Sequence, residues 1–246
     1  TIIHLHFQKH FLATALQAFV ADLLMLVKGR HSKGEALGYE ALEDNTIGNN
    51  NTALGYWTLY SNTTGDNNTA IGYNSLFNNT ADNNTAVGVS ALAANTTGSE
   101  NTAVGQIAMD ANTTGSANTS VGQGSLASNT TASNNTAVGK SALGANTTGT
   151  RNTAVGSLAL DANTTANNNV ALGYNVLAAD TLGSFSTAVG SQALRDQNFT
   201  TATANYNVAV GANAGLSITT GVQNTLVGTL AGDALTDADA NVAVGI

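Results

Sequence analysis

A 17-residue repeat constrains the fold of this chain more than any other feature. Its consensus reads N-T-A-V-G-x-x-A-L-x-x-N-T-T-G, and one copy occupies residues 101–115, with Met109 at the leucine position. The glycine of the pentad recurs at positions 38, 55, 72, 88, 105, 122, 139, 156, 173, 190, 211, 228 and 245. The spacing is constant except for a shorter step from 72 to 88 and a longer step from 190 to 211. A short, fixed period predicts stacked coils in which each coil contacts only its neighbours.

The apolar pattern inside each repeat predicts a parallel β-solenoid. Along T-A-V-G, Thr and Val face one way while the preceding Asn, the Ala and the Gly face the other, as in a strand. A second apolar row follows each glycine by four positions and contains Leu42, Leu59, Leu76, Leu92, Met109, Leu126, Leu143, Leu160, Leu177 and Leu194. We therefore predict an all-β, flattened roll of about 12–13 coils, each with two short strands and two turns, and a rod about 60 Å long. Small Ala and one Leu per coil fill its lumen.

The turns of the predicted coils are as regular as the strands. One position is asparagine in eight coils, and amides stacked in this way can hydrogen-bond from coil to coil: Asn45, Asn62, Asn79, Asn95, Asn112, Asn129, Asn146 and Asn163. The glycines at 48, 65, 98, 115, 149 and 183 are predicted to close the same turn with positive φ. A longer insert, residues 195–206, precedes the final coils. The last coil lacks a capping element, which predicts that the chain continues or stacks end to end.

If Ala and Leu fill the lumen, the Thr/Val side of the strands faces outward along the whole rod. A large contiguous apolar patch of this kind normally marks an interface. We expect a homotrimer in which three such faces meet on a common axis. The predicted interface comprises Thr52, Leu54, Thr69, Ile71, Thr85, Val87, Thr102, Val104, Val121, Thr136, Val138, Thr153 and Val155.

Aromatic residues that are not part of the repeat consensus are concentrated in the first three coils. They are Tyr39, Tyr56, Trp57, Tyr60, Tyr73 and Phe77. One interpretation is a contact patch for a carbohydrate or a surface receptor. The other, which we favour, is that the patch receives the N-terminal helix described next, whose Phe11 and Phe19 need apolar partners.

Residues 1–34 form a separate region before the repeat domain of residues 35–246. A helical stripe with 4-3-4-3 spacing predicts an amphipathic helix that packs on partner helices or caps the first coil: Leu12, Leu16, Phe19, Leu23 and Leu26. Asp22 lies within this apolar run, which argues against interpreting the segment as a secretory signal or as a membrane span. His4 and His6 would share one face of a strand, but no third metal ligand is evident.

Composition disfavours several classes of function. The chain of 246 residues has a net charge of -8, and residues 35–246 carry three basic against fourteen acidic residues, which disfavours binding to nucleic acid. All four histidines lie in residues 1–31, and the acidic residues are scattered, so we predict no catalytic, cofactor or metal site. Asp66 and Asp82 are more typical of solvated turns than of a weak cation site. The N-T-T triplets at Asn62 and Asn95 match the N-glycosylation sequon, but they also suit turns.

The repeated N-T-A-V-G and N-T-A-I-G pentads, each followed by x-x-A-L, resemble the YadA-like head repeats of trimeric autotransporter adhesins. Related repeats occur in phage and other fibre proteins, and the resemblance covers residues 35–246. It implies a trimeric, left-handed parallel β-roll outside the cell, on a cell surface or in a virion fibre, that works in attachment. Two other functions stay open. One is a filament subunit that polymerises through its open coil edges, and the other is an ice-binding solenoid that presents the Thr ladder.

Overall fold

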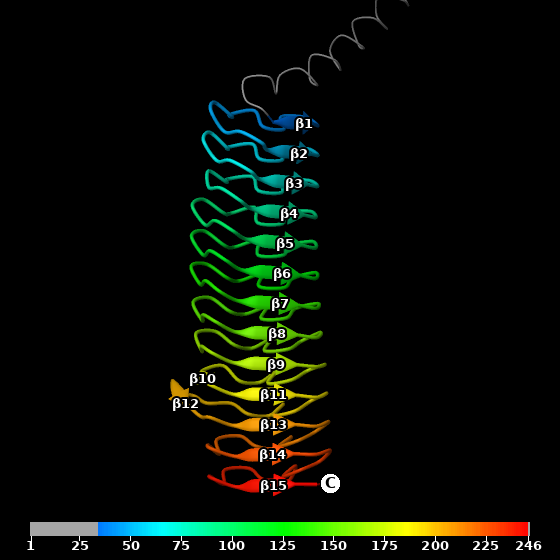
Figure 1. Ribbon diagram of the computed structural model, residues 1–246, viewed down its shortest axis with the longest axis vertical. Coiled ribbons are helices and arrows are strands. Elements are labelled where there is room, and N and C mark those ends of the chain that lie inside the picture. Colours follow the sequence, from blue (N-terminus) through cyan, green and yellow to red (C-terminus); the bar gives the residue numbers. More distant parts are fainter. Residues whose placement is uncertain (1–33, 246) are drawn as a thin grey trace, which may run out of the picture.

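The structure, a computed structural model, describes residues 34–245. In this range the chain forms a single column of stacked coils (Figure 1), so the predicted all-β parallel solenoid with 17-residue coils is confirmed. No helix occurs among these residues. The helix predicted around residues 12–26, and the pair His4 and His6, lie outside the described part of the chain.

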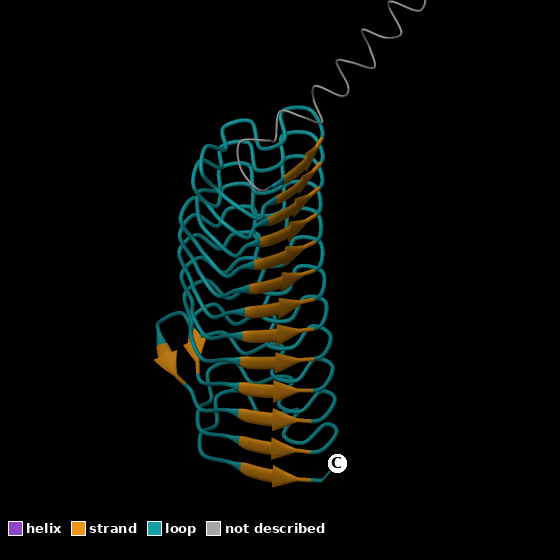
Figure 2. Cartoon of the chain, turned by 45° about the horizontal axis from the view of Figure 1, so that its top comes forward, coloured by secondary structure: helices purple, strands orange, loops and turns teal. Residues whose placement is uncertain are grey.

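Thirteen of the strands form one parallel sheet along one side of the column (Figure 2). They follow one another in chain order, and each residue pairs with its repeat equivalent, as Ala86 pairs with Ala103. The strands are β1 (Glu35–Leu37), β2 (Thr52–Leu54), β3 (Thr69–Ile71), β4 (Thr85–Val87), β5 (Thr102–Val104), β6 (Thr119–Val121), β7 (Thr136–Val138), β8 (Thr153–Val155), β9 (Val170–Leu172), β11 (Thr187–Val189), β13 (Val208–Val210), β14 (Thr225–Val227) and β15 (Val242–Val244). A separate two-stranded parallel sheet joins β10 (Gly183–Ser184) to β12 (Thr203–Ala204).

The prediction of two strands per coil is wrong, because the second apolar row lies in a turn. Met109 has a φ of +52°, and Ile107, two positions earlier, also has a φ of +52°. Each left-handed residue other than Gly costs roughly 1–2 kcal/mol. Complete burial of the Leu or Met side chain contributes roughly 1.5–3 kcal/mol, which offsets most of the cost of the two left-handed residues. The turn backbone still bonds to the next coil, as when the Leu92 N–H donates to the Ala108 carbonyl at 3.0 Å.

The lumen is filled as predicted by one Ala of the strand and one Leu of the turn. Ala103 and Met109 are completely buried, and so are their equivalents in the neighbouring coils. The Ala of the x-x-A-L segment, for example Ala108, also points inward and is completely buried. Two small Ala side chains and one larger Leu or Met side chain in most coils form a narrow core that runs along the column.

The glycine of the pentad is required for two reasons in every coil that has a further described coil stacked after it. Gly105 has a φ of +138°, which L side chains rarely adopt. A Cβ at this position would lie 2.5 Å from the carbonyl oxygen of Gly122 in the next coil. The prediction of positive φ at the turn glycines is wrong, since Gly48 and Gly115 do not have a left-handed φ. Glycine is needed at these two positions for a different reason: a Cβ there would lie 2.5 Å or less from a carbonyl oxygen of the next coil.

Two ladders of buried asparagines run inside the column. In the predicted ladder, Asn112 donates from Nδ2 to Asn95 Oδ1 at 2.8 Å and accepts from Asn129 Nδ2 at 2.8 Å, which confirms bonding from coil to coil. A second ladder is formed by the Asn of the pentad. Asn101 Oδ1 accepts the backbone N–H of Asn118 at 3.0 Å, and its Nδ2 donates to the Gly115 carbonyl at 2.8 Å. Both ladders pair polar groups that burial would otherwise penalise.

Three buried side-chain atoms in the described coils lack a hydrogen-bond partner, and each lies where the repeat is broken. Asn62 lies in the coil before the 16-residue coil. There Asn79 Nδ2 donates to the Ala81 carbonyl of its own shortened turn and not to Asn62 Oδ1. Asn163 lies one coil before Asp180. The carboxylate of Asp180 stands where the ladder would have an amide donor, so Asn163 Oδ1 has no partner. Asn205 Nδ2 lies in the insertion. Buried side-chain amides are fully hydrogen-bonded where the repeat is regular, and the unpaired atoms occur where it is interrupted.

Candidate interaction surface

The outward face of the long sheet carries the predicted Thr/Val ladder. In the central strands the burial alternates as expected: Ala103 is buried, while Thr102 and Val104 on either side are partly exposed. The outward aliphatic column has one member in each strand of the sheet: Leu37, Leu54, Ile71, Val87, Val104, Val121, Val138, Val155, Leu172, Val189, Val210, Val227 and Val244. The structure therefore brings the thirteen predicted interface residues into one continuous strip.

The strip is apolar and also regular. Leu54 is 42% exposed and Val155 is 37% exposed, so a substantial part of each aliphatic side chain faces solvent. Thr102 pairs in register with Thr85 and Thr119, which places the hydroxyl-bearing side chains in a regular row beside the aliphatic column. Such a strip can bury apolar area against a second flat surface and offers hydroxyl groups along one edge.

The six predicted aromatic residues form one cluster on the first three coils. Tyr39 and Tyr56 stack with ring centroids 4.8 Å apart, and Tyr56 and Tyr73 stack at 5.6 Å. Trp57 packs at a tilt against both Tyr56 and Tyr73. The cluster continues through Phe77, which lies 6.0 Å from Trp57 and stacks on Tyr60 at 5.2 Å. We call these six residues the aromatic patch.

Carboxylates border the aromatic patch. The Trp57 Nε1–H donates to Glu40 Oε2 at 2.8 Å. A hydrogen bond to Glu40 and the charge of that carboxylate raise the pKa of Tyr39. The negative charge of Asp44 raises the pKa of Tyr60. The edge of the patch is therefore anionic at neutral pH, and both of these phenols stay protonated there.

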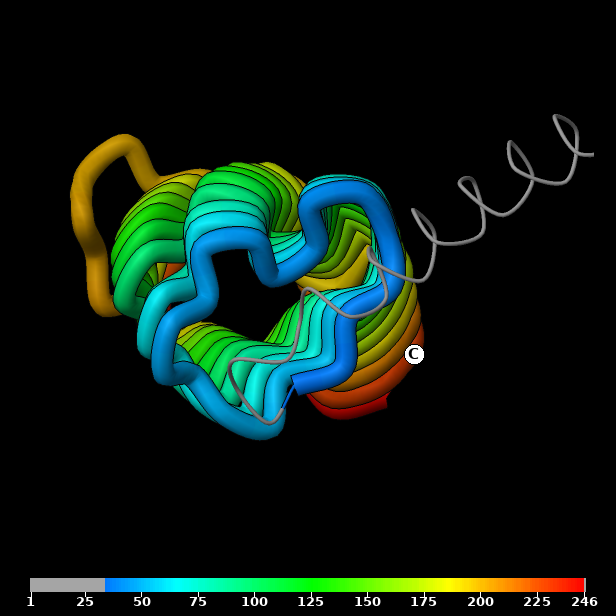
Figure 3. The backbone as a smooth tube through the Cα atoms, turned by 90° about the horizontal axis from the view of Figure 1, so that it is seen from above, coloured from blue at the N-terminus to red at the C-terminus, as the bar shows by residue number. Residues whose placement is uncertain are grey.

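The insertion produces the one buried carboxylate network in residues 34–245. It protrudes from the column as the gold loop in Figure 3 and contains β12. Asp180 is 1% exposed and accepts from Gln197 Nε2 at 2.5 Å and from the Gly183 N–H at 2.9 Å. Gln197 also donates to Ser186 Oγ at 3.0 Å and accepts from Asn207 Nδ2 at 2.8 Å. The repeat places Asp180 in the asparagine ladder, one period after Asn163, a signal that the sequence contained and our interpretation missed.

Asp180 should make the stability of the solenoid depend on pH. Burial raises the pKa of this carboxyl above its ordinary value of 3.8, although its hydrogen bonds act in the opposite direction. The folded state then holds a proton that the unfolded state releases, so stability falls as the pH rises from the ordinary value through the folded pKa. We expect Asp180→Asn to remove this part of the pH dependence. Urea unfolding of both proteins across pH 4–8 measures the difference in their free energies of unfolding. Burial also raises the pKa values of Asp110 and Asp161, but both proteins contain these residues, so the difference reports Asp180 alone. Parallel pH profiles for the two proteins would contradict the expectation.

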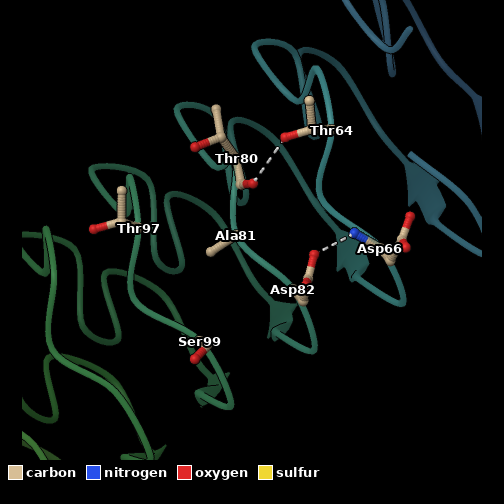
Figure 4. A pocket seen from close by; sticks show the side chains of 7 residues that line it. All are labelled: Thr64, Asp66, Thr80, Ala81, Asp82, Thr97 and Ser99. Atoms are coloured by element: carbon tan, nitrogen blue, oxygen red, sulfur yellow. Dashed lines mark hydrogen bonds between the residues drawn. The ribbon is translucent and has the colours of Figure 1, made fainter. Parts of the chain in front are cut away.

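Asp66 and Asp82 serve as turn residues. Asp82 Oδ1 accepts the backbone N–H of Asp66 at 2.7 Å (Figure 4). In the same way, Asp66 Oδ1 accepts the backbone N–H of Asn49 at 2.6 Å, so each carboxylate bonds to the backbone of the preceding coil. They line an open depression of about 450 Å³ beside Thr64 and Thr80, where the 16-residue coil is one residue short. In the described residues, no group of three or more His, Asp or Glu is placed to hold a metal ion.

The asparagines of the N-T-T triplets are part of the core, whereas the threonines lie on the turn surface. Asn62 and Asn95 are completely buried, and their Nδ2 atoms donate to the preceding coil and to a carbonyl of their own turn. An amide held in this way is not accessible for glycosylation in the folded solenoid. The turn interpretation of these triplets is therefore the one that the structure supports.

A second aromatic pair, which the sequence interpretation missed, lies beside the insertion. Phe185 and Tyr206 stack with ring centroids 5.3 Å apart and are 43% and 53% exposed. Phe185 precedes the insertion and Tyr206 is its last residue, so only the alignment of the repeats across the insertion shows that they are neighbours.

Comparison of the chain with family models, curated protein sequences and solved structures found no match. No helix in the described residues is long and apolar enough to cross a membrane. The fold and the surfaces described above are therefore the basis for any functional inference.

Proposed function

We propose that this protein is a non-enzymatic, extracellular structural or adhesive rod that assembles as a homotrimer through the Thr/Val ladder. The observation that carries this proposal is the outward aliphatic column, which has one partly exposed side chain in every strand of the thirteen-stranded sheet. A column of this length in water is unfavourable, and burial against copies of the same surface relieves it.

The construction of the coils supports a mechanical rather than a catalytic role. Backbone hydrogen bonds, two asparagine ladders and a continuous core join each coil to the next. Such a column keeps a fixed spacing along its axis and presents the same face at each step. The pentads that resemble YadA-like head repeats agree with a role in attachment on a cell surface or a fibre.

The mass of the particle in solution tests the assembly. We expect light scattering on a sizing column to give three times the 24.7 kDa of the chain. Val104→Asp/Val121→Asp places two carboxylates in the middle of the column, where burial of an unpaired charge costs several kcal/mol. We expect this variant to run as a monomer with an unchanged circular-dichroism spectrum. Thr114→Asp/Thr131→Asp adds the same charges on exposed turns and should keep the trimer.

Other outcomes of the same measurement favour the other functions. A wild-type monomer would contradict the homotrimer. Thermal hysteresis in that monomer, if Thr102→Tyr abolishes it, would support an ice-binding face, which the in-register Thr row favours. A mass that grows with concentration without a plateau would support a filament subunit.

A further inference from the structure

We propose that residues 11–33 of this chain dock on the aromatic patch of its own first three coils. The patch includes three exposed tyrosines, occurs on the first three coils only, and begins shortly after Gly34, the first described residue. This contact is separate from the Thr/Val ladder, and it does not depend on the trimer.

The shape of the aromatic patch suits aliphatic side chains. Tyr39, Tyr56 and Tyr73 are 45%, 41% and 48% exposed, which is a large aromatic area on a surface otherwise rich in Asn and Thr. Because these rings stack on one another, the faces of the central ring are covered and its edge points outward. A sugar ring needs a free aromatic face, whereas Leu and Val side chains pack against edges equally well. The stripe that the sequence predicts at Leu12, Leu16, Phe19, Leu23 and Leu26 supplies such side chains.

Charge complementarity points to the same occupant. The first coil carries three carboxylates near the patch, Glu40, Glu43 and Asp44. Residues 34–139 contain no Lys or Arg. Residues 11–33 hold three of the seven basic residues of the chain, Lys28, Arg30 and Lys33, and one acidic residue, Asp22. Opposite charges of this kind orient a segment and favour its contact with the surface.

The connection is long enough for docking within one chain. Tyr39 follows Lys33 closely in the sequence, a span of at most about 20 Å, and the next two tyrosines lie in coils stacked at roughly 4.8 Å each. Because the segment is tethered beside the patch, its effective concentration there is high, and even a modest apolar contact is sufficient.

Trp57 is the only tryptophan of the chain and lies inside the patch, so its fluorescence reports the contact directly. The full chain is compared with Leu16→Asp/Leu23→Asp, which breaks the apolar stripe. We expect the emission of Trp57 to shift to the red and its acrylamide quenching constant to rise roughly two-fold in this variant, because the indole becomes more accessible to solvent.

A matched control distinguishes the effect of breaking the apolar stripe from the effect of adding negative charge. Thr14→Asp/Ala21→Asp adds the same two carboxylates on the opposite face of the predicted helix and should leave the Trp57 emission unchanged. Circular dichroism of the solenoid and the mass of the particle are recorded on the same samples, so that a loss of fold or of the trimer is distinguished from undocking.

Two results would overturn the proposal. In the first, Trp57 is equally accessible in the full chain and in Leu16→Asp/Leu23→Asp, so that the patch is free for another partner. In the second, quenching of the wild type increases on dilution, so that the covering segment comes from a second copy.

Discussion

Gly105→Ala should destabilise the solenoid by about 3–5 kcal/mol, since it combines a left-handed φ with a steric clash. The φ of +138° at this residue is unfavourable for any side chain. The new Cβ would lie 2.5 Å from the carbonyl oxygen of Gly122 and 2.7 Å from its carbonyl carbon. Both atoms belong to backbone that is bonded into the next coil, so relief of the clash requires separation of two coils. Urea unfolding followed by circular dichroism measures the loss.

Gly124→Ser is the matched control for this prediction. Gly124 has a φ of +68°, and a Cβ there would come no closer than 3.7 Å to Ser141 Oγ. Ser90 and Ser141 occupy the same repeat position at a φ of +55°. We therefore expect a change within about 1 kcal/mol. If Gly105→Ala were as stable as Gly124→Ser, close coil contact at the pentad glycine would not be a requirement of the fold.

Asn112→Ala should cost about 2–4 kcal/mol, because it breaks a buried ladder in the middle of the column. Asn112 donates to Asn95 Oδ1 at 2.8 Å and to the Gly115 carbonyl at 3.0 Å, and it accepts from Asn129 Nδ2 at 2.8 Å. Removal of the amide leaves Asn95 Oδ1 without its donor and Asn129 Nδ2 without this acceptor, while the Gly115 carbonyl keeps its bond from Asn101 Nδ2. Hydrogen exchange should show the loss of protection first in the two coils on either side.

Asn78→Ala provides the comparison for the ladder. Asn78 is exposed on a turn, and only its backbone bonds to the next coil. Its replacement should change the free energy of unfolding by no more than about 0.5 kcal/mol. Equal effects at Asn78 and Asn112 would mean that the ladder does not contribute to stability.

Most of the fold followed from the repeat. The period placed equivalent residues one above another, and the alternation in T-A-V-G decided that Ala103 faces inward and Val104 faces outward. The same period predicted that Asn112 would bond to its equivalents, and it grouped the aromatic patch on three successive coils. Each of these predictions needed only the position of a residue within the coil.

The failures concern the backbone between the repeated positions. The spacing of Ile107 and Met109 was compatible with a second strand, and only the structure shows that both residues have positive φ. The turn glycines were expected to have positive φ, but Gly115 is needed for close approach to the next coil. In both cases several backbone conformations satisfy the same spacing, and packing of one coil on the next selects among them.

The sequence by itself therefore determined the architecture, the pairing register and the outward face, because stacking of identical coils leaves each residue beside its own equivalent. Only the tertiary structure decided the path of the turns and the consequences of the irregular coils. The missing residue near Asn79, the carboxylate of Asp180 and the insertion each leave a buried polar atom without a partner. Hydrogen-bond geometry depends on the exact position of both partners, and a repeat pattern does not specify that position once the repeat is broken.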